Sequence, residues 1–476
     1  MTRHKVRIQS FCGKIRQKST YMMKYGRIRH KMIRVNQIKV PLSHRQEDIL
    51  YKTAKILRIA PEKILSWQIV KKSIDARKKP EIMVIYSVDV HVEAQDKVLR
   101  GCKSAQAQAV TTKPYRFPKA GEEPFPHRPV IVGSGPAGLF CGYLLARHGY
   151  RPLILERGRC VEDRQKDVER FWQNGVLDFS SNVQFGEGGA GTFSDGKLNT
   201  LVKDKYGRNG EVLRIFVENG APEQILYEAK PHIGTDILCR VVHNMREQIN
   251  AWGGDVRFET QVTDLCCQAD QITGVVINGG ERIECAVVVL AIGHSARDTF
   301  EMLNGKQIPM EAKSFAVGLR MEHPRRLIDR MQYGTEENPF LPAASYKVTA
   351  QTSSGRGVYS FCMCPGGYVV NASSEPGRLA VNGMSYSSRS GENSNSAMIV
   401  TVTPEDYGDD SPLAGIAFQR KLEEKAFQIG GGAVPVETYG DYRQAVTGQV
   451  PEASVINREY PDFVPAVKVA CQMAAV

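Results

Sequence analysis

The chain has 476 residues, enough for two or three domains, and its 24% of charged residues and mean hydropathy of −0.31 are typical of a globular protein. No apolar run approaches the roughly 18 residues of a membrane-spanning helix, so we expect no membrane span. The net charge of +12 comes from residues 1–46, which hold 13 basic residues and no acid. The net charge of the rest of the chain is therefore close to zero.

The 11 cysteines are an odd number and form no C-x-x-C pair. This usage favours reduced thiols and therefore a cytoplasmic location.

The basic segment 1–31 has three interpretations. It is an arm that binds nucleic acid or a membrane surface through salt-dependent phosphate contacts, an organelle transit peptide, or a disordered extension before a domain that starts at Met32. We favour the last, so nucleic acid is not an expected partner apart from this arm.

Residues 32–102 predict a small α+β domain. Residues 33–40 are strand-like, residues 49–57 follow helical spacing, and two apolar runs flank a turn at residues 78–80. Residues 103–129 carry five prolines and are interpreted as a linker.

A βαβ unit starts at Val130. A short apolar strand runs into Gly133-x-Gly135-x-x-Gly138, a helical stretch follows, and a second apolar run ends at Glu156. In such a unit the glycines allow a tight turn, close approach of a pyrophosphate and close helix–strand packing, while the acid accepts hydrogen bonds from a ribose. The pattern predicts a dinucleotide site contacted by Gly133, Ser134, Gly135, Pro136, Ala137, Gly138, Glu156 and Arg157.

A second glycine-rich segment spans residues 183–197. Such glycine density is unsuited to a helix or strand interior and favours close backbone approach to a flat or charged group. A flexible surface loop is the alternative, although Phe185 and Phe193 favour an ordered one. The residues expected at the cofactor here are Gly188, Gly189, Gly191 and Thr192.

Residues 253–292 alternate short strands with turns and end in a buried strand at Ala291-Ile292-Gly293. We expect an antiparallel meander followed by a parallel strand that places Gly293 against the cofactor. No second G-x-G-x-x-G follows a strand downstream, so NAD(P)H is expected at most as a transient electron donor.

The Gly133–Gly138 motif with Glu156, the segment 185–197 and Phe361-Cys-Met-Cys-Pro-Gly-Gly367 together resemble the uncharacterised bacterial FAD-dependent dehydrogenases, which are relatives of the glutathione-reductase-type flavoproteins with one dinucleotide domain. The resemblance covers roughly residues 32–440. It implies FAD as cofactor, with the adenosine on the first motif and the second glycine-rich segment near the flavin. It does not identify a substrate.

Residues 304–430 are expected to form an inserted α+β substrate domain with a polar loop at residues 382–395. Arg389 in this loop is a candidate clamp for an anionic small-molecule substrate, with a solvated loop as the alternative. Cys364 in the Cys362-x-Cys364 pair and His294 after the last strand are weaker catalytic candidates. Buried thiols are often only small apolar residues, and a histidine often only caps a strand. No metal-ligand spacing stands out.

The resemblance fades after Tyr442, and the acid and glycine-rich helix start that usually close this kind of flavin site are not found. Residues 431–476 are therefore expected to be an incomplete return to the FAD domain of a truncated chain that retains FAD weakly or not at all.

The complete prediction is an α/β fold with an FAD-type Rossmann domain at residues 130–303. The function is that of an FAD-dependent oxidoreductase that transfers hydride between flavin and an unidentified organic substrate. A non-catalytic nucleotide-binding or RNA-associated protein and an inactive truncated flavoprotein are the alternatives. No oligomeric state is predicted.

Overall fold

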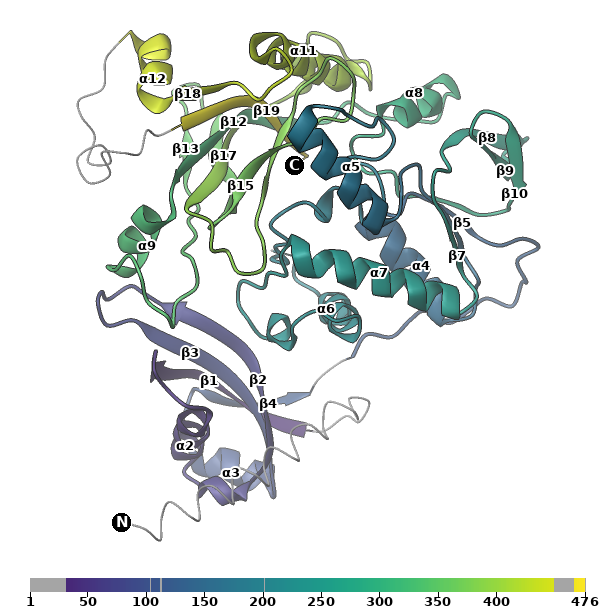
Figure 1. Ribbon diagram of the computed structural model, residues 1–476. Coiled ribbons are helices and arrows are strands. Elements are labelled where there is room, and N and C mark those ends of the chain that lie inside the picture. Colours follow the sequence, from purple (N-terminus) through teal and green to yellow (C-terminus); the bar gives the residue numbers. More distant parts are fainter. Residues whose placement is uncertain (1–30, 103, 112–113, 201, 449–465, 476) are drawn as a thin grey trace.

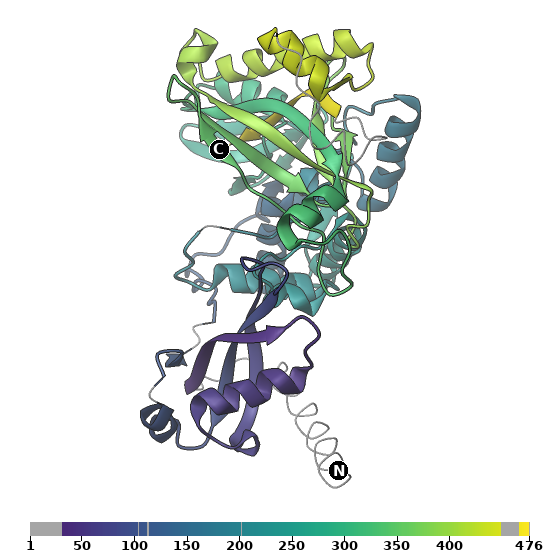
Figure 2. The same cartoon turned by 90° about the vertical axis from the view of Figure 1, so that its left-hand side faces the viewer.

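The structure is a computed structural model that describes residues 31–102, 104–111, 114–200, 202–448 and 466–475, the last range by its backbone alone. The interpretations placed on residues 1–30 lie outside the described residues. An N-terminal domain occupies one end of the molecule, and the dinucleotide domain and C-terminal domain lie together at the other (Figures 1 and 2).

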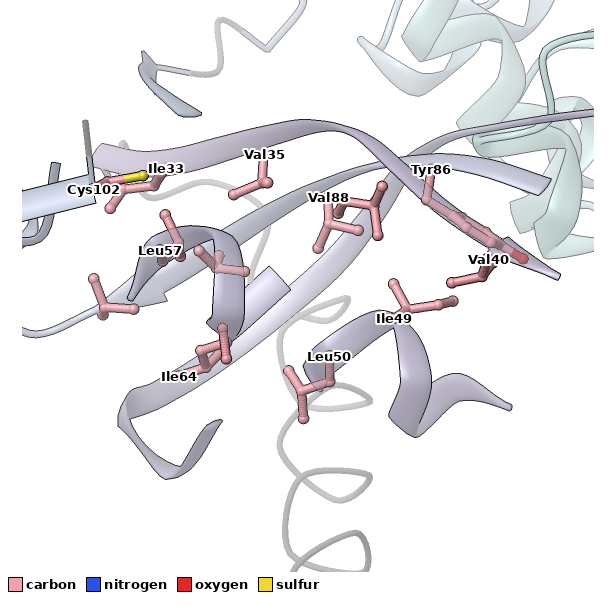
Figure 3. Packing of buried hydrophobic residues seen from close by; sticks show 14 of the residues in the cluster. Ile33, Val35, Val40, Ile49, Leu50, Leu57, Ile64, Tyr86, Val88 and Cys102 are labelled. Carbon is pink, nitrogen blue, oxygen red and sulfur yellow. The ribbon is translucent and has the colours of Figure 1, made fainter. Parts of the chain in front are cut away.

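The N-terminal domain is a four-stranded antiparallel sheet in the order β2-β3-β1-β4, with helices packed on one face. Its apolar core lies between the sheet and α2 (Figure 3). Gln37, at φ 57°, forms a bulge in β1 that shifts the alternation, so both Val35 and Ile38 point into this core. The elements are β1 Lys31–Pro41, α2 Gln46–Leu57, η1 Pro61–Lys63, β2 Ile64–Asp75, β3 Met83–Val92, α3 Gln95–Cys102 and β4 Ala107–Thr111.

Part of the predicted linker belongs to this domain. Strand β4 lies inside the segment 103–129 and pairs with β1 along Lys31–Val35. Its alternating Ala, Gln and Val residues are too weakly apolar to be recognised beside the prolines that follow. The described part of the connection without helix or strand therefore begins at Pro114.

The dinucleotide domain has a parallel sheet in the order β11-β5-β6-β7 between two layers. Ile131 and Ile154 point into a core with the helices, whereas Val130 and Leu155 pack against the antiparallel meander β8-β9-β10. The expected meander and final parallel strand are thus confirmed. The elements are β5 Val130–Val132, α4 Pro136–Arg147, β6 Leu153–Leu155, α5 Val161–Asn174, η2 Gly189–Gly191, α6 Arg208–Glu218, η3 Glu223–Leu226, α7 Thr235–Ala251, β7 Asp255–Arg257, β8 Val262–Gln268, β9 Gln271–Ile277, β10 Glu281–Glu284, β11 Val288–Leu290 and α8 Arg297–Gly305.

The C-terminal domain is built on a six-stranded sheet in the order β13-β14-β17-β12-β19-β18, with a small β15-β16 ribbon beside it. Helices α11 and α12 lie at the outer end of this domain in Figure 1. The elements are β12 Phe315–Pro324, α9 Arg325–Tyr333, β13 Thr349–Gln351, β14 Gly357–Cys364, β15 Tyr368–Asn371, β16 Val381–Met384, β17 Asn393–Val402, α10 Pro404–Tyr407, α11 Ala414–Gly430, β18 Val436–Thr438, α12 Tyr439–Thr447 and β19 Ala466–Ala475.

Two expectations for this domain differ from the structure. The polar segment 382–395 is not one loop, because it holds the end of β16 and the start of β17. Ser394 and Asn395 are buried, and they accept hydrogen bonds from the Gly366 N–H and from Arg320. Residues 431–476 also do not return to the dinucleotide sheet in the described part, since β19 lies between β12 and β18.

The N-terminal domain contacts the dinucleotide domain through β2. The Lys72 N–H donates to Tyr227 O at 2.7 Å, and the Ala229 N–H donates to Lys72 O at 2.8 Å. Among the described residues, no helix combines the length and the apolar character needed to cross a membrane.

Candidate functional site

A cleft of about 460 Å³ opens at the carboxyl ends of β5, β6 and β11. This edge of a parallel sheet is where doubly wound folds bind ligands. The cleft brings together residues that were singled out from four separate segments. These are Gly133, Gly135, Pro136, Ala137, Glu156, Arg157, Gly189, Gly191, Gly293 and His294.

The three glycines of the first motif have different surroundings. A Cβ on Gly133, at φ +98°, would lie 2.6 Å from Ala291 O on the chain after β11, and one on Gly138 would lie 1.9 Å from Gly133 O. A Cβ on Gly135 would meet nothing nearer than Gly189 Cα at 3.8 Å. Gly133 and Gly138 are therefore required by packing, whereas Gly135 leaves open space at the start of α4.

The second glycine-rich segment packs directly on the first. The Gly188 N–H donates to Ser134 O at 2.9 Å, and a Cβ on Gly189 would lie 2.9 Å from Gly135 Cα. Gly189 and Gly191 line the cleft. Ser134, Gly138, Gly188 and Thr192 are buried behind its wall.

Arg164 on α5 holds this segment in place, and sequence reasoning missed it. Its side chain is fully buried and donates to the carbonyls of Asn182 at 2.8 Å, Val183 at 3.0 Å and Glu187 at 2.6 Å. A polar helix with one more arginine carries no signal of this role. The contacts show that the segment is an ordered structure and not a loose surface loop.

Glu156 directly follows β6, and its carboxylate accepts hydrogen bonds from the protein itself. One oxygen accepts from Ser134 N and Oγ, both at 2.8 Å, and the other accepts from Gly158 N and Gly186 N, both at 3.0 Å. These four donors fill the carboxylate, and they tie the two glycine-rich segments together. A ribose hydroxyl would have to share or displace one of them, so the ribose contact stays a prediction.

The remaining wall of the cleft combines apolar residues with a few polar side chains. The Arg157 guanidinium lies 4.4 Å from the Phe185 ring centroid and donates to Asp298 at 2.9 Å. Gly293 adopts φ +71° next to His294. Part of His294 faces the open cleft, but the surrounding protein removes enough water to lower the pKa of its imidazole, and the Arg297 charge acts in the same direction.

Arg389 and Cys364 do not line this cleft. Arg389 pairs with the buried carboxylate of Asp195, its Nε lying 3.2 Å from Oδ1, and Lys197 Nζ lies 3.1 Å from Oδ2 of the same residue. A substrate carboxylate would have to compete with Asp195 for the guanidinium. Cys364 belongs to this second cluster, since Lys197 Nζ lies 3.8 Å from its Sγ. In the described part of the chain, no cluster of three or more His, Cys, Asp or Glu residues is arranged to hold a metal ion.

Three family models match the chain. Residues 131–164 match the NAD(P)-binding Rossmann-like domain, residues 314–469 match the FAD-dependent protein, C-terminal domain-like family, and residues 32–91 match a domain of unknown function. The chain is 47% identical over 414 residues to an uncharacterized protein of Clostridium beijerinckii, an alignment that covers 86% of this chain and 77% of that protein.

Solved structures show a distant similarity. Thermovibrio ammonificans THI4 is 21% identical, with a TM-score of 0.25, over 38% of this chain and 63% of that one. The halogenase PltM is 11% identical, with a TM-score of 0.30, over 62% of this chain and 55% of that one. The flavin-dependent brominase Bmp2 is 13% identical, with a TM-score of 0.27, over 63% of each chain. The chain thus spans less than two thirds of the length of these proteins, and at these TM-scores the similarity supports no statement about function.

Proposed function

Because the chain belongs to the same family as the uncharacterized Clostridium beijerinckii protein and carries the C-terminal domain of FAD-dependent proteins, we propose that it is an oxidoreductase that transfers hydride between FAD and an organic substrate. The observation that carries the proposal is the cleft, where a Rossmann-type helix start and a second glycine-rich segment face one space.

The residues around the cleft fit a dinucleotide. Helix α4 starts at Pro136, and the N–H groups of its first turn point toward the cleft end of the helix without intrahelical acceptors. The positive end of the helix dipole adds to their attraction for a pyrophosphate. A Cβ at Gly135 would occupy the open space that the phosphates need.

When bound, FAD supplies the hydride chemistry through its flavin ring. The N–H groups of Gly135 and Ala137 would bind the pyrophosphate, Pro136 would contact it without donating a hydrogen bond, and Arg157 would position the nucleotide. The lowered pKa of His294 makes its imidazole neutral near pH 7, so its free ring nitrogen would accept a proton from a substrate and not donate one. NAD(P)H would act only as a transient donor, and we place the protein in the cytoplasm.

The substitution Gly135→Ala tests this assignment sharply. The backbone of Gly135, with φ −62°, is open to any residue, and its new methyl group would meet no protein atom closer than 3.8 Å. The variant should therefore fold normally and lose FAD affinity by about tenfold or more, an effect of roughly 1.4 kcal/mol. Titration of the apoprotein with FAD, followed by flavin fluorescence, measures the change.

Gly305→Ala is the matched control, because it adds the same methyl group on α8, where nothing lies within 4 Å and the cleft is not lined by this residue. Its FAD affinity should equal that of the wild type. Unchanged FAD affinity in Gly135→Ala, or no binding of FAD by the wild type, would refute the proposed site.

A further inference from the structure

Two thiols meet in β14, away from the residues that line the cleft. The Sγ atoms of Cys362 and Cys364 lie 3.9 Å apart, with Cys362 half-buried and Cys364 fully buried. The pairing of β14 with β17 shifts its register between Phe361 and Cys364, and Cys362 adopts φ 46°. This irregular backbone brings the two sulfur atoms together, and a disulfide of about 2.05 Å needs an approach of only about 2 Å more.

Positive charge surrounds the pair. Arg320 is fully buried and donates to Cys362 O at 3.0 Å, and its Nη1 lies 3.9 Å from Cys364 Sγ. Lys197 Nζ lies 3.8 Å from the same sulfur atom. Gly383 leaves room for Arg320, because a Cβ there would lie 2.0 Å from Nη1. Such surroundings stabilise a thiolate.

The two thiols differ in acidity. The hydrogen bond from Cys364, together with the charges of Lys197 and Arg320, holds the pKa of Cys362 well below its ordinary value despite burial. Burial, with the neighbouring Cys362 thiolate, raises the pKa of Cys364 well above the usual range. Cys362 is also the half-buried member of the pair, so it is the thiol that a small disulfide can reach, whereas Cys364 is fully buried behind it.

We propose that Cys362 and Cys364 form a redox-active dithiol that exchanges with low-molecular-weight disulfides. The Cys362 thiolate attacks one sulfur of the small disulfide, whose S–S bond breaks, and a mixed disulfide forms while one small thiolate leaves. Cys364 then gives up its proton and attacks the Cys362 sulfur, which releases the second small thiol. Two protein thiols are oxidised to one disulfide, and one small disulfide is reduced to two thiols.

Mass spectrometry of the full chain tests the proposal with glutathione disulfide as the probe. Tryptic cleavage after Arg356 and Arg378 gives a peptide that holds Cys362 and Cys364 as its only cysteines. After incubation near pH 7 and blocking of free thiols, this peptide should carry an internal disulfide and weigh about 2 Da less than its reduced form. The exposed Cys267 is the control thiol and should react about tenfold more slowly.

Variants separate the two roles. Cys364→Ser should stop at the mixed disulfide on Cys362, and Cys362→Ser should leave the peptide unmodified. Lys197→Met should move the rate profile of Cys362 modification to higher pH, and Lys197→Arg should restore it, a pattern that a purely structural lysine would not give. Two free thiols in the wild-type peptide while Cys267 is modified would overturn the proposal, as would an unchanged pH profile in Lys197→Met.

Discussion

At the scale of single residues, buried charges fix the backbone around the cleft. Glu156 accepts four hydrogen bonds from two glycine-rich segments, and Arg164 donates to the carbonyls of the second one. Neither group is left without partners, which is the condition for burying charge at low cost. The backbone conformation of the glycine-rich segments therefore depends on the side chains of Glu156 and Arg164.

His232 is a residue whose titration should be visible in stability. Burial, helped by the charge of Arg389, lowers its pKa from 6.5 to about 4, and Nε2 is buried with no partner in the described structure. The folded state therefore resists protonation, and the stability present above pH 6.5 should fall as the pH drops toward 4. Between about pH 7 and about pH 5, the wild type should lose at most about 2 kcal/mol more than His232→Gln.

Denaturant unfolding of both proteins at the two pH values measures this difference. His232→Gln keeps a polar side chain of similar length but cannot titrate. Equal losses in the two proteins would show that His232 does not couple folding to pH.

At the scale of elements, helix α8 of the dinucleotide domain is fastened to α11 of the C-terminal domain. Arg297 donates two hydrogen bonds to Glu423, at 2.7 and 2.8 Å, and one to Gln419 at 3.1 Å. The side chains of Arg297 and Glu423 are only 6% and 5% exposed, so this ion pair is shielded from water and salt.

Neighbouring glutamates on α11 allow a matched comparison. Glu423→Ala should cost about 2 to 3 kcal/mol, since it removes one of the two carboxylates paired with a buried guanidinium in the described structure and leaves Glu375. Glu424→Ala removes only the ion pair with Arg378. The side chain of Glu424 is 46% exposed, so this substitution should cost about 1 kcal/mol or less. The free energies of unfolding of the two variants test this difference. Equal values would contradict the conclusion that burial makes the Arg297–Glu423 pair the more costly one to break.

Elements with a regular apolar pattern could be predicted from the sequence, and elements held by buried polar groups could not. The βαβ unit followed from Val130, the glycine spacing and Glu156, and the structure brings most of the predicted cofactor residues to one cleft. The start of β17 was interpreted as a loop, because Ser394 and Asn395 are polar and their burial depends on partners far along the chain. The Lys197–Cys364 contact was missed for the same reason.

At the scale of the whole molecule, the N-terminal domain has a core of its own in which no residue beyond Ala107 takes part, among the side chains that the structure describes. Its covalent connection to the rest includes residues 114–129, which form neither helix nor strand and where Arg116 and Lys119 are exposed. The domain should therefore remain folded when this connection is cut.

Limited digestion with trypsin under native conditions checks this expectation. Cleavage after Arg116 or Lys119 should release an N-terminal fragment that resists further digestion within β1 to β4 and unfolds cooperatively by circular dichroism. A fragment that is degraded as fast as it appears would show that the domain depends on its contacts with Tyr227, Ala229 and Met331.

The position of β19 has a consequence for the order in which the molecule is made. The strand lies between β12 and β18, and Phe315 pairs with Ala475. During translation the ribosome releases β12 long before β19, so one edge of β12 has no neighbour while the intervening residues are synthesised. The nascent C-terminal domain thus carries an open strand edge until β19 leaves the exit tunnel. During that interval a chaperone or a second nascent chain would bind to this edge.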